Sequence, residues 1–534
     1  MKFITRSLLF LLALYGLVFA IGDWYLVRSG GSLWIAVLFA IAFVGLQYLV
    51  APWIIQWVLD ISWCDEGAEL PDANREFLEK LCAERGLKMP RIGIIYSGTP
   101  NAFSFGRVRR DARIVITSGL LDILTPQEAN AVLAHELGHV EHYDFAVMTI
   151  AALAPLLLYQ LYIVLDRVNS ARAVAYGAYL CYLFSQYVVL MLNRTREYFA
   201  DHYAADVTHA PSTLSSALIK IAYGMVREEG EYQRIMATGD KDDKAAARKL
   251  RRLAGTVALM GISNVRSGSS LALTQADPAG AAAVMKWDLV NPWARFYELG
   301  STHPLTALRV RELNRDCAAM NQATAYPLPE DQRIRWGSFP LEFLIWVLPV
   351  ISGAVLFATF FFPAIFRSMG LDMPANLRPT VLVVLGVTWF ARILFRYRGT
   401  FEPAHVGRLL EDLEVSQMRP RAVSLKGKVV GRGEPGAFWS PDLVLRDETG
   451  IIYLLYRSSI PGARLLFGSV KADDYVGQEI SVDGWFRRGL VPYVEIYKLI
   501  NQSGEIRKLY SRWIQCGVAA ACIAVGLIWL NGGF

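Results

Sequence analysis

Cysteine is scarce in this chain of 534 residues, and it forms no regular pattern. The six cysteines are scattered, none belongs to a C-x-x-C pair, and Cys516 and Cys522 lie inside an apolar run. This distribution argues against a disulfide framework and against a zinc site built from cysteine. A clear basic–aromatic pattern is also lacking, so we expect no nucleic-acid partner.

Apolar residues dominate the composition instead. Hydrophobic residues make up 54% of the chain, and the mean hydropathy is +0.31. That is too apolar for an ordinary soluble protein, and the excess is concentrated in long runs. Because a helix of roughly 20 residues spans a bilayer, these runs predict a multi-span α-helical membrane protein with the lipid bilayer as a partner.

Seven apolar runs are long enough to span a bilayer. The first can also be read as a cleaved signal peptide ending near Ala20, although we favour an uncleaved anchor. Lys2 and Arg6 favour a cytoplasmic N-terminus, whereas Arg167 and Arg172 count against the resulting arrangement. We expect a multi-pass protein of the bacterial inner membrane, with its soluble regions facing the cytoplasm. The runs are Met1–Val27, Leu33–Leu59, Phe145–Leu165, Ala175–Leu192, Leu341–Phe366, Pro379–Phe395 and Trp513–Leu530.

The runs divide the chain into five parts. Residues 1–59 hold two spans, and residues 60–340 form a mainly soluble domain that includes the hairpin 145–192 and an insertion at about 229–300. A second hairpin covers 341–396, a β-rich domain covers 419–509, and a last span covers 513–530. The β-rich domain has five short strand candidates with glycines between them, which suit a small OB-like barrel that docks or gates substrates. These candidates are Val423–Val430, Leu443–Arg446, Ile451–Tyr456, Ile480–Trp485 and Tyr493–Leu499.

The region before the third span has mixed α and β character. Pro71–Gly86 has the pattern of a helix that ends at a glycine. Arg91–Tyr96 and Ala112–Thr117 are two short apolar strands. The segment between them, Pro100–Arg110, is rich in turn residues, and we expect a loop there.

The stretch Thr125–Asp144 carries an H-E-x-x-H pattern, His135-Glu136-Leu137-Gly138-His139. Thr125 can cap a helix, Pro126 suits its first position, and Glu128 completes a capping box. Residues i and i+4 share one face of a helix, so His135 and His139 can both reach one metal ion. Glu136 lies where it can contact a water molecule beside that metal.

A third metal ligand is expected on another element. The segment that follows the fourth span carries Glu197 and Asp201, which are also spaced i and i+4. Glu197 can complete the ligand set, and Asp201 can hold the free N–H group of a ligand histidine. The alternative is that the two residues form an exposed acidic pair bridged to Arg194 or Arg196. Glu141, His142 and Asp144 are assigned to the surroundings of the metal or to solvent, without a preference.

These motifs resemble those of the integral-membrane zinc metallopeptidases of the HtpX and CAAX-prenyl-protease superfamily. The resemblance covers about Asp60–Leu313. It implies an α+β zincin-like metalloprotease domain with one Zn²⁺ held by His135, His139 and Glu197, and with Glu136 as the general base. It also makes His303 a candidate that stabilises the transition state or caps the metal, or else a residue that merely precedes a helix. The matching segments are Asn101–Phe103, Val115–Leu120, Ala134–His139, Arg196–Asp201 and Thr302–Pro304 with Arg309.

The resemblance implies a zinc endopeptidase that cleaves membrane-associated or misfolded proteins. We expect the substrate to lie as an extended strand along the edge strand Ala112–Thr117, with Ile116 and Thr117 pairing with it and Asn101, Ala102 and Phe103 on its other side. Two alternatives remain open: a processing peptidase for lipid-anchored protein tails, and a non-catalytic membrane scaffold. The spans after residue 340 and the β-rich domain lie outside the resemblance.

Overall fold

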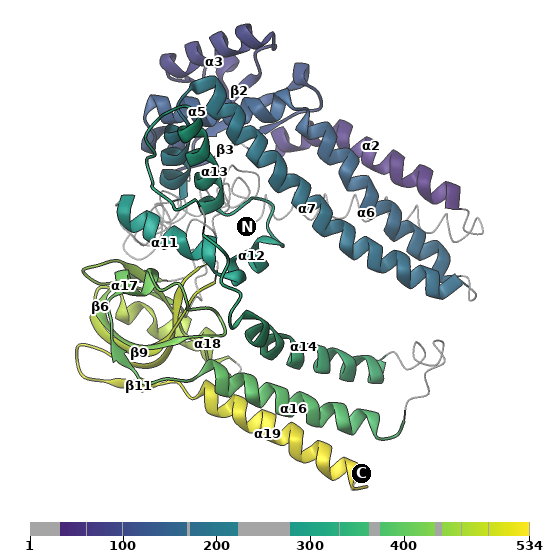
Figure 1. Ribbon diagram of the computed structural model, residues 1–534, viewed down its shortest axis with the longest axis vertical. Helices are drawn as coiled ribbons and strands as arrows, with labels where there is room; N and C mark the ends of the chain where they lie inside the picture. The colour runs from purple at the N-terminus through teal and green to yellow at the C-terminus, as the bar shows by residue number, and fades with distance from the viewer. Residues whose placement is uncertain are drawn as a thin grey trace. The chain divides into compact units, whose positions relative to one another are not determined.

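The computed structural model comprises two compact units (Figure 1). The first comprises the described residues up to 222 together with 296–330, and the second comprises 278–295 and the described residues from 332 onward. The described residues are 33–59, 61–98, 100–167, 171–222, 278–330, 332–361, 374–432, 441–460, 462–489 and 491–532. The first predicted span, Met1–Val27, and most of the predicted insertion lie outside them.

A small mixed sheet forms one layer of the first unit. Its strands are β1 (Ser62–Trp63), β2 (Arg91–Ile95), β3 (Ala102–Phe105) and β4 (Arg113–Thr117), in the order β1-β2-β4-β3. β2 and β4 are parallel, and the other pairs are antiparallel. The two predicted strands are confirmed to within one residue, but the loop predicted over Pro100–Arg110 is wrong, because β3 lies inside it.

The position of β3 overturns a second expectation. β4 was expected to be an edge strand, but it lies between β2 and β3. Ile116 pairs with Ala102 of β3, and Thr117 pairs with Ile95 of β2. Both edges of β4 are therefore occupied, and among the described strands β3 is the one with a free edge on this side of the sheet.

Helices pack on the sheet and extend away from it. The predicted first helix is confirmed as α3 (Asp72–Arg85), which ends at Gly86 in the left-handed conformation, with φ of 63°. The hydrophobic core lies between the sheet, α3, α4 (Ser118–Ile123) and α5 (Pro126–Glu141), with Leu78, Ile114 and Leu133 almost completely buried. The remaining helices of the unit are α2 (Leu33–Val58), α6 (Asp144–Asp166), α7 (Arg172–Thr208), α13 (Thr306–Ala319) and a segment at 211–222.

Six described helices are long and apolar enough to cross a membrane, and they coincide with the second to seventh predicted spans. This confirms a multi-span integral membrane protein. α7 continues without a break from its apolar half through Glu197 and Asp201 (Figure 1). α5 and α6, by contrast, are separated by a turn at His142 and Tyr143.

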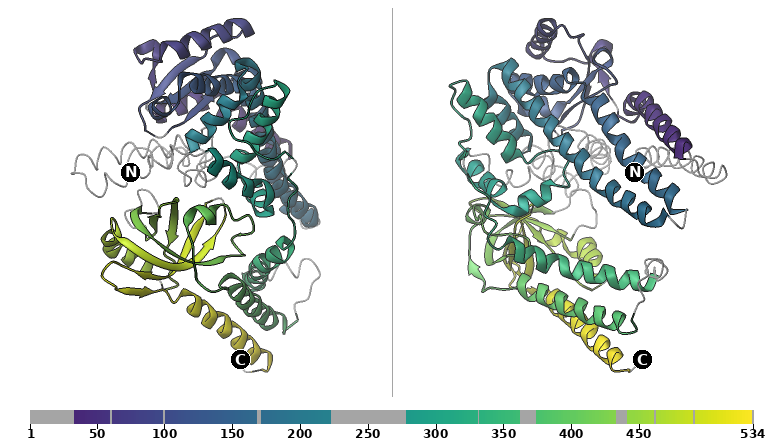
Figure 2. Two further views of the ribbon diagram at one scale, coloured as in Figure 1. Left: turned by 60° about the vertical axis from the view of Figure 1, so that its left-hand side comes forward. Right: turned by 45° about the vertical axis from the view of Figure 1, so that its right-hand side comes forward.

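The second unit contains the predicted OB-like barrel (Figure 2). Its strands close in the order β6-β7-β8-β10-β9, and β9 returns to β6. β8 and β10 are parallel, and every other pair in the ring is antiparallel. Their inward-facing residues, such as Leu425, Leu454 and Val494, are fully buried in one core. The five strands are β6 (Arg421–Arg432), β7 (Leu443–Arg446), β8 (Ile451–Leu455), β9 (Glu479–Arg487) and β10 (Tyr493–Ile500).

Three membrane helices of the second unit lie next to the barrel (Figures 1 and 2). α14 (Phe339–Phe361) and α19 (Ser511–Leu530) begin near the barrel, and α16 (Leu377–Arg396) ends there. Gly386 allows a close approach of α16 and α19, because a Cβ atom there would lie only 2.6 Å from the Ile523 side chain and 2.8 Å from the Ala519 carbonyl oxygen. Small residues at such contacts are typical of helix packing in membranes.

Candidate metal centre

The α5 helix places the two histidines of the H-E-x-x-H pattern on one buried face. The predicted capping box is confirmed, since the Thr125 N–H donates to Glu128 Oε2 at 2.8 Å and the Glu128 N–H donates to Thr125 Oγ1 at 3.3 Å. One turn apart, His135 and His139 bring their Nε2 atoms to 3.2 Å from each other. Both rings are almost completely buried, as is Glu136 between them.

The α7 helix brings the third candidate ligand to this pair. Glu197 Oε2 lies 3.7 Å from His135 Nε2, and Glu197 Oε1 lies 3.7 Å from His139 Nε2. One ligand atom from each of the three residues lies within 4.8 Å of the others. Glu197 and Asp201 are only 3% and 1% exposed, so the alternative of an exposed acidic pair is wrong.

Close contact between α5 and α7 depends on the glycine of the motif. A Cβ atom at Gly138 would lie 3.0 Å from Tyr203 Cδ1 and 3.3 Å from Ala200 Cα. Such distances are shorter than ordinary van der Waals contacts. The absence of a side chain at Gly138 thus lets the two helices approach closely enough for Glu197 to face both histidines.

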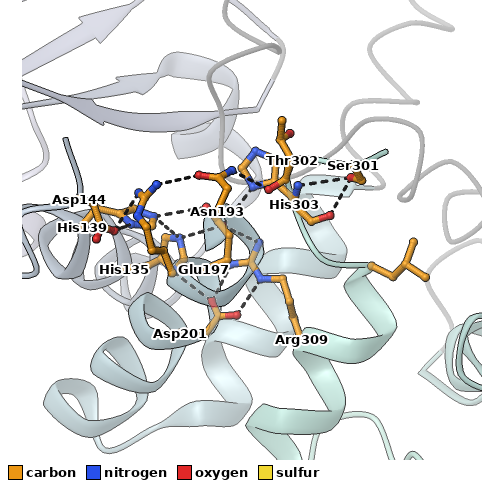
Figure 3. A network of polar contacts seen from close by, with 12 residues as sticks. His135, His139, Asp144, Asn193, Glu197, Asp201, Ser301, Thr302, His303 and Arg309 are labelled. Atoms are coloured by element: carbon orange, nitrogen blue, oxygen red, sulfur yellow. Dashed lines mark hydrogen bonds and ion pairs between the residues drawn. The ribbon is translucent and has the colours of Figure 1, made fainter. Parts of the chain in front are cut away.

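Asp201 lies behind His135. Its Oδ1 atom is 3.0 Å from His135 Nδ1 (Figure 3). On its other side Asp201 accepts two hydrogen bonds from Arg309 of α13, at 2.7 and 2.6 Å. Arg309 is itself buried. Burial disfavours its charge, but Asp201 and Glu197 raise the pKa of Arg309 above its usual range. Arg309 therefore fixes Asp201, which in turn orients the histidine.

Asp144 lies beside His139 in the same way, a role that the sequence alone leaves open. The backbone of Tyr143 is left-handed, with φ of 56°, and this turn directs Asp144 back towards α5. Asp144 Oδ2 lies 2.6 Å from His139 Nδ1 and 2.9 Å from the Arg196 guanidinium. The only sequence signal for this contact is an acidic residue at the first position of the next span.

His303 lies beside Glu197, in the loop that precedes α13. His303 Nδ1 is 3.1 Å from Glu197 Oε2 (Figure 3). The loop is held on α7 by Asn193, whose side-chain amide donates to the Thr302 carbonyl oxygen at 2.6 Å. Arg194 of α7 donates to the Ser301 carbonyl oxygen at 3.0 Å. His303 is therefore positioned by the helix that carries Glu197, the third candidate ligand.

The donor set fits a divalent metal ion. Each histidine has a carboxylate at Nδ1, so its lone pair lies on Nε2, and the two Nε2 atoms face each other. Two lone pairs at 3.2 Å repel each other unless a cation or a proton lies between them. Burial disfavours a positive charge on His139, yet Asp144, Glu197 and Glu136 raise its pKa. The cluster thus attracts positive charge.

Distances and charge agree with this interpretation. Ligand nitrogens about 2.0–2.1 Å from a tetrahedral zinc ion lie about 3.3 Å apart, close to the separation of the two Nε2 atoms. Four carboxylates surround the histidines, and two guanidinium groups contact these carboxylates. A divalent cation balances the excess negative charge of these four carboxylates and two guanidinium groups. The carboxylates belong to Glu136, Asp144, Glu197 and Asp201, and the guanidinium groups to Arg196 and Arg309.

The residues predicted to contact substrate lie on and beside β3, which packs next to α5. The Asn101 N–H donates to Thr117 Oγ1 at 2.8 Å, and Asn101 Oδ1 accepts from the Ala102 N–H at 3.0 Å. The Phe103 and Ile116 side chains are buried in separate parts of the core. These side chains shape the strand rather than offering a surface to a ligand.

Comparisons with known proteins agree with the site. Residues 72–316 match Peptidase_M48, "Peptidase family M48". The chain is 36% identical over 227 residues to "Protease HtpX homolog" of Methanothermobacter thermautotrophicus, which covers 41% of this chain and 86% of that protein. It is 31% identical over 232 residues to "Protease HtpX homolog" of Moorella thermoacetica, a match that covers 41% of this chain and 76% of that protein.

A crystal structure of S. mikatae Ste24p is similar over 58% of this chain and 65% of its own, with a TM-score of 0.37 and 16% identical residues. The family match covers the capped α5 helix, Glu197 on α7 and the His303 loop. The chain belongs to peptidase family M48 and is an integral-membrane metalloprotease.

Proposed function

We propose that this chain is a zinc-dependent endopeptidase that hydrolyses peptide bonds in membrane-associated or misfolded proteins. The observation that carries the proposal is the buried set of His135, His139 and Glu197, in which each histidine is held by a carboxylate. Two imidazoles and one carboxylate form a ligand set that is found in hydrolytic zinc sites. The carboxylates at Nδ1 fix the orientation and tautomer of each ring.

In this proposal Glu136 is the general base. When bound, zinc lowers the pKa of a coordinated water towards 7 and polarises the substrate carbonyl group. Glu136 accepts the proton of the attacking water and then delivers it to the leaving amine. Its position next to His135 on the buried face of α5 supports this role. Arg309 acts through Asp201 and keeps the site charge-neutral.

His303 has a supporting role. Its Nδ1 atom lies 3.1 Å from Glu197 Oε2, and this contact leaves Oε1 of the same carboxylate for the metal. The His303 ring is partly exposed, with 15% of its side chain accessible, unlike His135. A partly accessible imidazole beside the ligands can donate to the oxyanion of a substrate. We assign His303 to orienting Glu197 and to stabilising this oxyanion.

The proposed substrate class follows from the placement of the ligands. Glu197 lies five residues after the apolar run that ends at Leu192, or about 8 Å along the helix. A peptide bond of a membrane protein can reach such a site without leaving the bilayer surface. The free edge of β3 offers backbone groups to an extended peptide, as sheet edges do in other peptide-binding proteins. We place Ala102 at this edge, whereas the backbone of Asn101 bonds to Thr117 of β4.

The test uses the full-length protein loaded with zinc and a membrane-protein substrate. We expect Glu136→Gln to retain the metal and to lose cleavage by at least about a hundredfold. Glu197→Ala should lose both the metal and cleavage. Equal cleavage by wild type and Glu136→Gln would contradict the mechanism, and full zinc occupancy in Glu197→Ala would contradict the ligand assignment.

The same assay separates the alternatives. Preference for a lipid-anchored tail over an internal bond of the same protein would identify a processing peptidase. Stable binding of substrates without cleavage, in a protein that carries a full complement of zinc, would identify a scaffold. The intact Glu136 favours an active enzyme, because a scaffold has no need of a base at that position.

A further inference from the structure

A second site lies in the other unit, where the membrane helices meet the barrel. A cavity of about 610 Å³ opens between α14, α16 and α19. At the barrel end it is lined by Arg392 and Arg396 of α16 and by Gln515 of α19. Further along the helices its walls are apolar, with Val350, Leu385 and Val518 among the lining residues. The cavity is therefore cationic at one end and hydrophobic at the other.

Among the described residues, the positive charge at the barrel end exceeds the negative charge beside it. Arg392 forms no hydrogen bond or ion pair with any residue in the described ranges, and Arg396, Arg457 and Arg487 act on it as like charges. A half-buried guanidinium group among like charges is unfavourable without an anion. Arg392 and Arg396 are one helical turn apart, so both can face the same ligand.

The nearby carboxylate is already engaged. Glu495 of β10 is buried and accepts hydrogen bonds from Arg487 at 3.0 Å and from the Tyr397 hydroxyl at 2.5 Å. Arg396 approaches the same carboxylate only to 3.6 Å. The Glu495 carboxylate is thus closer to Arg487 than to Arg396. The buried Nε atom of Arg396 has no hydrogen-bond partner among the described residues. Both cavity arginines keep donors for an external anion.

The position of Arg392 and Arg396 along α16 indicates which kind of anion can bind. Arg392 and Arg396 lie in the last two turns of a candidate membrane span, at the level where lipid headgroups are found. Leu385 lies seven residues before Arg392, about 10 Å deeper along α16. Val350 and Val518 lie on exposed, apolar faces of their helices. A ligand that fills the cavity must pair a phosphate-sized anion with an apolar chain.

We propose that this cavity binds an anionic phospholipid, with the headgroup phosphate between Arg392 and Arg396 and an acyl chain along Leu385, Val350 and Val518. The guanidinium groups donate hydrogen bonds to the phosphate oxygens, and Gln515 extends this polar end. The lipid then contacts all three membrane helices of its unit. This site does not depend on the peptidase reaction.

The experiment is native mass spectrometry of the full-length protein released from detergent after equilibration with dioleoylphosphatidylglycerol or dioleoylphosphatidylcholine. We expect about tenfold stronger retention of the anionic lipid, and Arg392→Gln should reduce that retention about tenfold. Arg398→Gln is the matched control, because this exposed arginine lies just past the end of α16 and does not line the cavity. Arg398→Gln should change retention of the anionic lipid by less than about twofold.

Two further measurements make the result decisive. Val518→Trp should reduce retention of the lipid while leaving both arginines in place, because the larger side chain fills the apolar end of the cavity. Glycerol phosphate and inorganic phosphate should not compete at millimolar concentration. Equal retention of the two lipids, unchanged retention in Arg392→Gln, or equal competition by free phosphate would each overturn the proposal.

Discussion

His139 Nδ1 lies 2.6 Å from Asp144 Oδ2, and the two residues belong to different helices that are joined by a left-handed turn at Tyr143. One of these helices carries the H-E-x-x-H pattern, and the other is a membrane span. The contact therefore couples the proposed metal site to the start of a transmembrane helix. Arg196 from the next span donates to the same carboxylate at 2.9 Å.

The first prediction tests this contact. Asp144→Asn keeps the shape of the side chain but removes the charge that orients His139. We expect zinc affinity to fall about 10–100-fold, the range found when a partner of a metal-ligating histidine is lost. Competition with a chromophoric chelator measures the affinity. Asp166→Asn, at the far end of the same helix, is the control and should not change it.

The second prediction concerns Arg309. Arg309→Met leaves Asp201 buried without a cation, and we expect it to lower the free energy of unfolding by about 3–5 kcal/mol. Arg315→Met on the same helix is the control, because Arg315 is 51% exposed and pairs with Glu312 at the surface. That pair should contribute less than about 1 kcal/mol. Thermal unfolding in detergent at constant metal concentration measures both, and similar losses in the two variants would contradict the structural role of Arg309.

The third prediction concerns the approach of α5 and α7. Gly138→Ala adds a Cβ atom 3.0 Å from Tyr203 and 3.3 Å from the Ala200 backbone, so α7 must shift. We expect a destabilisation of about 1–3 kcal/mol. Glu197 moves with α7, so peptidase activity should fall up to about a hundredfold. Gly177→Ala in α7 has no neighbour within 4 Å and should be neutral or stabilising. Full activity in Gly138→Ala would show that the contact does not position the ligand.

Much of this architecture could be predicted because its signals are local. The capping box, the spacing of His135 and His139, the apolar spans and the alternating strands of the barrel all depend on residues within one turn or one strand. The ligand role of Glu197 was predicted from its place after an adjacent span. The confirmed OB-like ring shows that short strands separated by glycines are enough to predict a small barrel.

The missed features depend on tertiary contacts or on unusual backbone geometry. Tyr143 adopts a left-handed conformation without being glycine, and nothing in its neighbours predicts this. Asp201 and Arg309 pair across 108 residues of sequence. β3 has only four residues and lies between turn-forming residues, so its strand character depends on pairing with β4. The error about the edge strand follows directly from the omission of β3.

The fourth prediction concerns pH and the start of α5. Burial opposes ionisation of Glu128, but Lys220, Ser216 and the Thr125 N–H lower its pKa below the usual value of 4.5. A carboxylate whose pKa is lower in the folded state stabilises the protein above the unfolded-state pKa, and this stabilisation is lost as the pH falls through the folded-state pKa. Wild type should therefore exceed Glu128→Gln in unfolding temperature at pH 7, and the difference should shrink below pH 4.5. Glu84→Gln, at an exposed position of α3, is the control, and a difference in unfolding temperature that does not change with pH would contradict the argument.

The fifth prediction tests whether substrates add to the free edge of β3. The Thr117 N–H donates to the Asn101 carbonyl oxygen, and antiparallel pairing alternates, so the backbone groups of Ser104 face away from β4. Ser104→Pro removes the outward N–H while leaving the bonds to β4, and we expect KM for a peptide substrate to rise about tenfold. Ser104→Ala keeps the N–H and should behave like wild type. Because proline also restricts the backbone, zinc content and unfolding temperature are measured beside KM. A raised KM at unchanged zinc content and stability supports strand addition, whereas an unchanged KM in a folded Ser104→Pro protein places the substrate elsewhere.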